Sequence, residues 1–118
     1  MTKQDYIDSI MNCAEDRDKV KAVSELYGGF INAVMAKVIS FADNADFIDE
    51  ERRAFSFNEI INASTEYGNN FKSLGIIPFM DAYDNTLIVY IIDDKKWAMF
   101  SMSDEVLFKK RDKLEEVL

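Results

Sequence analysis

The chain has 118 residues, and its formal net charge is −8 because 22 acidic residues outnumber 14 basic ones. This length fits one domain, and a hydrophobic fraction of 48% can form a core without disulfides. We therefore expect a single domain over residues 1–118. The negative charge argues against binding to nucleic acid or to an anionic membrane.

Three amphipathic helices are predicted in the first third of the chain. Apolar residues recur at three- and four-residue spacing in residues 6–14, 20–27 and 30–41, which places them on one helical face in each segment. Gly28-Gly29 predicts the end of the second helix and a turn. The acidic run that follows the third helix, residues 43–51, predicts a loop. It lacks the oxygen ligands and the glycine of a calcium-binding loop.

A fourth helix is predicted from about Phe57 to about Tyr67. Ser56 and Glu59 have the spacing of a capping box, in which each side chain bonds the backbone N–H of the other residue. The turn-forming residues 68–70 end this helix.

The second half of the chain predicts an antiparallel meander. The first strand, residues 76–80, contains Pro78, which donates no hydrogen bond, so we expect a bulge or an edge there, and an exposed edge would permit dimerisation. The turn Asp84-Asn85 leads into residues 87–92, an apolar run typical of a strand covered on both faces. After the charged turn 93–96, residues 97–102 form the third strand.

A closing helix is predicted from about Asp104 to Leu118, with Ser101 or Ser103 as its cap and with Leu107 and Leu114 on one side. The predicted fold class is therefore α+β, with N-terminal helices, an antiparallel β-meander sheet and a C-terminal helix.

The residue inventory argues against the common catalytic sites. The sequence has no histidine, which removes the usual general base and zinc ligand, and Cys13 is its single cysteine. No glycine-rich phosphate loop is present. We expect no enzyme activity, no cofactor and no metal site.

Carboxylates remain as an alternative source of catalysis. Asp81, Asp84, Asp93 and Asp94 flank the predicted central strand and could form a paired acid and base or a divalent-metal site in a hydrolase. The preference of Asp for turns explains their positions more simply.

The location of the protein is predicted from its first residues. Residues 1–6 carry charges where a signal peptide has its apolar segment, and no run approaches the roughly 18 apolar residues of a membrane helix. We expect a cytoplasmic protein.

Residues 74–85 (LGIIPFMDAYDN), followed by Val89-Tyr90, Lys96-Trp97 and Asp104-Glu105, resemble the signature of the SUKH superfamily, the Smi-one/Knr-four-like proteins. The signature region covers residues 74–105, and similarity to the family extends over residues 22–108. The resemblance implies an extended Gly-x-x-Pro-Phe stretch that enters a sheet, then a turn, a strand, a hairpin and a last helix.

The resemblance also implies a function. Many bacterial members are similar to immunity proteins, which neutralise a cognate toxin, often a nuclease, by binding it, and fungal relatives act as regulatory scaffolds. We therefore expect a non-catalytic domain that binds a protein partner, a basic toxin domain first and a signalling partner as the alternative. Carboxylates could mimic the phosphates that such a toxin binds, with aromatic side chains as anchors. The predicted contact residues are Asp81, Tyr83, Asp84, Asp93, Asp94 and Trp97.

Overall fold

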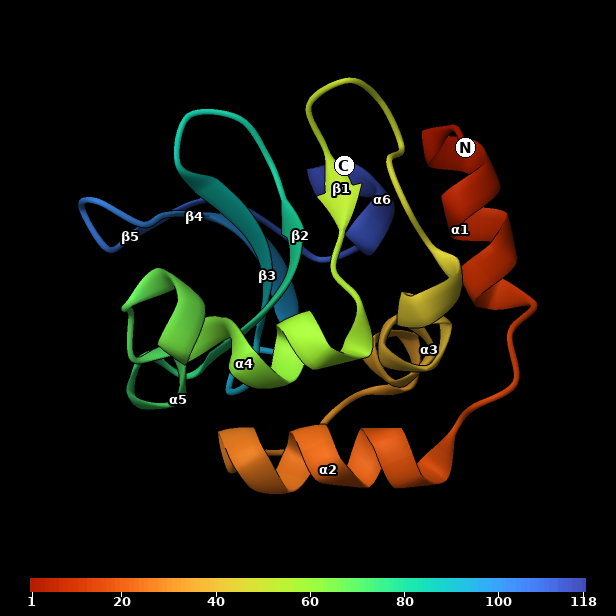
Figure 1. Ribbon diagram of the computed structural model, residues 1–118, viewed down its shortest axis with the longest axis horizontal. Helices are drawn as coiled ribbons and strands as arrows, with labels where there is room; N and C mark the ends of the chain where they lie inside the picture. Colours follow the sequence, from red (N-terminus) through yellow and green to blue (C-terminus); the bar gives the residue numbers. More distant parts are fainter.

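The computed structural model describes all 118 residues, as six α-helices, one 3₁₀ helix and five strands (Figure 1). The helices are α1 (Lys3–Met11), α2 (Arg17–Tyr27), α3 (Ala33–Phe41), η1 (Ala42–Asn44), α4 (Phe57–Tyr67), α5 (Phe71–Leu74) and α6 (Leu114–Val117). The strands are β1 (Arg53–Ala54), β2 (Ile76–Asp81), β3 (Thr86–Ile91), β4 (Lys96–Ser101) and β5 (Val106–Arg111). The predicted α+β class is confirmed. None of the helices has the length and apolar character needed to cross a bilayer.

The five strands form one sheet in the order β1-β2-β3-β4-β5, and each neighbouring pair is antiparallel. This is the predicted meander, extended by one strand at each edge. Helices α4 and α5 contact β2, while α6 contacts β4 and β5. In Figure 1 the long helix α2 runs along the side of the molecule that faces away from the sheet, beneath α3 and α4.

The central strand β3 is buried along its whole length, as its apolar sequence predicts. On one face of the sheet, Phe100 of β4 packs edge-on against Phe71 of α5. On the other face, Trp97 packs against Tyr90, whose hydroxyl accepts a hydrogen bond from the backbone N–H of Asn32 at the start of α3. One continuous cluster of 30 buried residues joins the two faces.

The stretch around Pro78 is bulged, as predicted. The register of β2 against β3 shifts between Pro78 and Met80. On its other side, β2 pairs only through Met80 and Asp81 with the two-residue strand β1. Pro78 has no backbone N–H to donate, and it lies outside the part of β2 that pairs with β1, so the sheet loses no hydrogen bond to β1 there.

The predicted helix from Asp104 to Leu118 is wrong over most of its length. Residues 106–111 form strand β5, and only Leu114–Val117 are helical. The turn before β5 contains Glu105 with φ 53°, which lies outside the right-handed helical region. Pairing with β4 satisfies the backbone groups along one side of that strand, and consecutive Val106, Leu107 and Phe108 suit an extended chain better than a helix of one apolar stripe.

The capping box of α4 is confirmed and is combined with an ion pair. Ser56 accepts a hydrogen bond from Glu59 N, and Glu59 Oε1 accepts one from Ser56 N at 2.9 Å. The same carboxylate accepts two hydrogen bonds from Arg53, at 2.8 and 2.6 Å. The hydrogen bonds from Arg53 are the main cause that lowers the pKa of Glu59. This pair joins α4 to the edge strand β1.

Replacing Glu59 by Gln is expected to lower the free energy of unfolding by about 1–3 kcal/mol at neutral pH, because the charged hydrogen bonds to Arg53 are lost. A carboxyl whose pKa is lowered in the folded state stabilises the fold at pH values above its ordinary pKa, which is 4.5 here. This contribution is lost as the pH falls through the lower pKa of the folded state. Urea unfolding of both proteins across this range should therefore show the difference shrinking with acid. A difference that is unchanged at about pH 2 would contradict this assignment.

Candidate partner-binding surface

Two loops lie together at one end of the sheet. The first, residues 45–52, joins η1 to β1, and the second is the β2–β3 turn, residues 82–85. They are adjacent because Phe47 bridges to Arg53, and Arg53 in turn pairs with Asp81 of β2. Both loops rise on the same side of the molecule in Figure 1. We call the surface that they form, with Asp81, the acidic rim.

Local hydrogen bonds shape the first loop. Ile48 is buried, and its N–H donates to Arg52 O at 2.9 Å, so the loop folds back on itself like a hairpin. Asp49 at the tip accepts hydrogen bonds from the backbone N–H groups of Glu51 and Arg52. The Arg52 guanidinium lies 2.6 Å from the Asp49 carboxylate and lowers its pKa. The Asp49 carboxylate therefore stabilises the conformation of the loop.

The β2–β3 turn has the geometry that its residues favour. Asp84 and Asn85 have φ values of 56° and 58°, in the left-handed region that Asp and Asn tolerate in turns. Ala82 N donates to Thr86 O at 3.0 Å and closes the turn. The predicted Asp84-Asn85 turn is confirmed, and it directs Tyr83 and Asp84 into solvent.

The acidic rim carries an excess of unpaired negative charge. Two of its neighbouring carboxylates are neutralised, Asp49 by Arg52 and Glu59 by Arg53. The remaining carboxylates of residues 46–59 and 81–85 form no ion pair with a basic side chain, and most of them are exposed. They are Asp46, Glu50, Glu51, Asp81 and Asp84.

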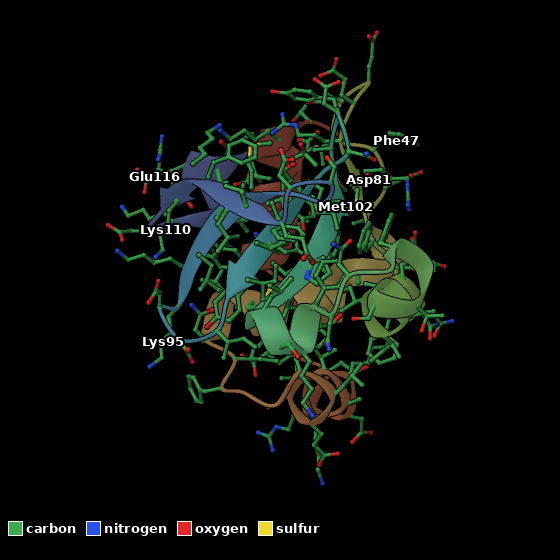
Figure 2. All side chains as sticks on the ribbon, turned by 90° about the vertical axis from the view of Figure 1, so that its left-hand side faces the viewer. Phe47, Asp81, Lys95, Met102, Lys110 and Glu116 are labelled. Carbon is green, nitrogen blue, oxygen red and sulfur yellow. The ribbon has the colours of Figure 1, made fainter.

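Two aromatic side chains stand exposed among these carboxylates. Phe47 and Tyr83 each keep 52% of their surface accessible. In Figure 2, Phe47 and Asp81 are labelled on the same side of the molecule, away from Lys110. Exposed aromatic side chains beside charged groups are typical anchors of protein interfaces, because they bury much area at low cost in side-chain entropy.

A polar hollow of about 700 Å³ adjoins the rim, between the end of α4 and the two hairpin turns. Asp81 and Tyr67 lie in its wall, and burial raises the pKa of the Tyr67 hydroxyl. At the other wall, the Asn69 amide donates to Met102 O at 3.2 Å and to Glu105 at 2.9 Å. Nowhere do three or more carboxylate or thiol groups gather in a way that could hold a metal ion.

The six predicted contact residues do not form one surface. Asp81, Tyr83 and Asp84 belong to the acidic rim. Asp93 and Asp94 lie in the turn at the opposite end of β3, about 20 Å away for a six-residue strand. Lys110 pairs with Asp94 and lowers its pKa.

Trp97, the sixth of these residues, is buried. Only 2% of its surface is accessible, and its ring lies edge-on to Phe79 with the centroids 5.5 Å apart. The side chain therefore supports the core of the sheet and offers no contact surface in this structure.

The loop 45–52 was not among the predicted contacts. Its signals in the sequence are the acidic run from Asp43 to Glu51 and the single aromatic residue within it, Phe47. Nothing local in the sequence indicates that this run lies beside the β2–β3 turn. Comparisons with protein-family models, with curated proteins and with solved structures found no match to this chain.

Proposed function

We propose that this protein is a cytoplasmic, non-catalytic binding domain of the immunity-protein type, which neutralises a basic toxin domain by binding it with the acidic rim. The observation that carries the proposal is the rim itself. Five unpaired carboxylates and the exposed rings of Phe47 and Tyr83 lie on two adjacent loops at one end of the sheet.

Electrostatics explains why a basic partner fits this surface. Adjacent carboxylates attract a basic protein over several ångströms and accelerate the encounter of the two molecules. A toxin that acts on nucleic acid binds phosphates with Lys and Arg side chains, and carboxylates can occupy the same places. Phe47 and Tyr83 would then supply the apolar contacts that hold the complex after encounter.

The order of the structural elements supports a place in the SUKH superfamily as part of this proposal. Gly75 ends α5 in a left-handed conformation, and the chain then enters the sheet with Pro78 and Phe79. The turn 82–85, strand β3, the β4–β5 hairpin and the short helix α6 follow in the order that the resemblance implies.

Coexpression tests the proposal. The protein should restore growth to cells that express its proposed cognate toxin domain, and a variant with Asp46, Glu50 and Glu51 changed to amides should restore growth less well. The matched control changes Asp18 and Glu25 of α2 and Glu15 just before it; α2 lies far from the rim in Figure 1. Failure of the unmodified protein to rescue growth would contradict the immunity role. Capture of a signalling protein in place of a toxin would favour the alternative role of a regulatory scaffold.

A further inference from the structure

Strand β5 forms a free edge of the sheet. The strand order ends at β5, and all six of its residues are exposed. Val106, Leu107 and Phe108 keep 52%, 39% and 44% of their surfaces accessible. Apolar side chains in a row on an edge strand are unusual, because such an edge can pair with another chain. Figure 2 labels Lys110 on this side of the molecule, opposite Phe47.

The outer side of β5 has no partner within the chain. Apart from its ladder with β4, the backbone of β5 takes part in one hydrogen bond, in which Arg111 Nη1 donates to Lys110 O at 2.9 Å. Every second residue of an edge strand presents its N–H and C=O outward. These groups of β5 are therefore available to another strand.

The charges along this segment change sign from one end to the other. Asp104 and Glu105 precede the apolar residues 106–108, and Lys109, Lys110 and Arg111 follow them. In an antiparallel pair of two such strands, the acidic end of each lies beside the basic end of the other. The segment is thus complementary to itself.

We propose that β5 is an interface for a second copy of this chain, with the two β5 strands antiparallel about a two-fold axis at Leu107. Val106 and Phe108 lie opposite Ser101 and Met99 of β4, on one face of the sheet. The axis places Val106 of each copy opposite Phe108 of the other on that face, with Glu105 opposite Lys109. The two sheets become one continuous sheet of ten strands.

Two features limit the assembly to a pair. Lys109 has φ 51° and lies where the register of β4 and β5 shifts, which forms a bulge. This bulge and the adjacent positive charges prevent the pairing between the two β5 strands from extending further. The opposite edge, β1, has only two residues. The acidic rim includes the β2–β3 turn, which lies at the same end of the sheet as the β4–β5 turn, and Tyr83 of the rim lines a hollow together with Lys109. The inference is argued from the residues of β5 and does not depend on the function of the rim.

The pair should be weak and dependent on concentration. Two short edge strands bury less than a standard interface, and each copy carries a net charge of −8. Sedimentation velocity at protein concentrations from about 10 μM to about 1 mM should show the average mass rising from that of one chain, 13.6 kDa, towards twice that value.

Charge reversal gives a sharper test. D104K/E105K makes the segment basic throughout, and K109E/R111E makes it acidic while leaving the ion pair of Lys110 with Asp94 intact. Each variant alone should associate at least tenfold more weakly than the unmodified protein. An equimolar mixture should form a heterodimer, because positions 105 and 109, which face each other in this register, then carry opposite charges at both ends. E15K/E25K, with the same change of charge at α2, should keep the association of the unmodified protein.

Circular dichroism and the thermal midpoint establish that each variant is folded. The proposal is overturned if the unmodified protein remains a monomer up to about 1 mM, if either charge variant associates as well as the unmodified protein, or if the mixture of folded variants does not associate.

Discussion

Replacing Trp97 by Ala is expected to lower the free energy of unfolding by about 3–5 kcal/mol. The indole is buried between two aromatic rings, with its centroid 5.5 Å from that of Phe79 and 5.1 Å from that of Tyr90. Truncation removes both contacts and leaves a cavity that the surrounding strands cannot fill, because β3 and β4 are fixed by hydrogen bonds on both sides.

Urea unfolding followed by circular dichroism measures this effect, and Tyr83→Ala supplies the comparison. Tyr83 is also a large aromatic residue, but it is exposed on the β2–β3 turn, so its removal should change the free energy of unfolding by no more than about 0.5 kcal/mol. Trp97→Phe should lie between the two variants. Equal effects of Trp97→Ala and Tyr83→Ala would contradict the placement of Trp97 in the core.

Local patterns in the sequence predict much of the fold. The capping box of Ser56 and Glu59, the stop at Gly28 and the apolar run of β3 each depend on residues that are close in the sequence. Such signals act through short-range hydrogen bonds and side-chain periodicity, and therefore they survive without knowledge of the rest of the chain. The α+β class follows from their order.

The features that the sequence did not predict depend on distant partners. Strand β1 has only two residues, and it is a strand because Asp81 and Met80 lie beside it. The segment 106–111 is a strand because β4 presents an open edge to it. A weak helical pattern over residues 107–118, with leucines at 107, 114 and 118, does not compete with a ladder of backbone hydrogen bonds.

The same reason explains why the structure brings only some of the predicted contact residues together. Asp81, Tyr83 and Asp84 share one turn, so their proximity is visible in the sequence, whereas Asp93 and Asp94 were grouped with them although β3 separates the two turns. The loop 45–52 joins the rim through the pairing of Phe47 with Arg53 and of Arg53 with Asp81. That relation is a property of the sheet and not of any short segment.

Neutralising the acidic rim is expected to slow association with a basic partner by about tenfold to a hundredfold at low salt. The variant D46N/E50Q/E51Q/D84N removes four exposed carboxylates, none of which forms an ion pair within the chain. The thermal midpoint should therefore change little, and a loss of binding would report on the interface rather than on folding.

Stopped-flow association with the proposed basic toxin partner, at about 0.05 and 0.5 M salt, measures the effect. The rate for the unmodified protein should fall steeply with salt, and that for the rim variant should fall less, because fewer charges steer the encounter. E15Q/D18N/E25Q/E115Q removes four exposed carboxylates elsewhere and separates net charge from location. If both variants slow association equally, the overall charge of −8 and not the rim attracts the partner, and the binding face must then be sought on another part of the molecule.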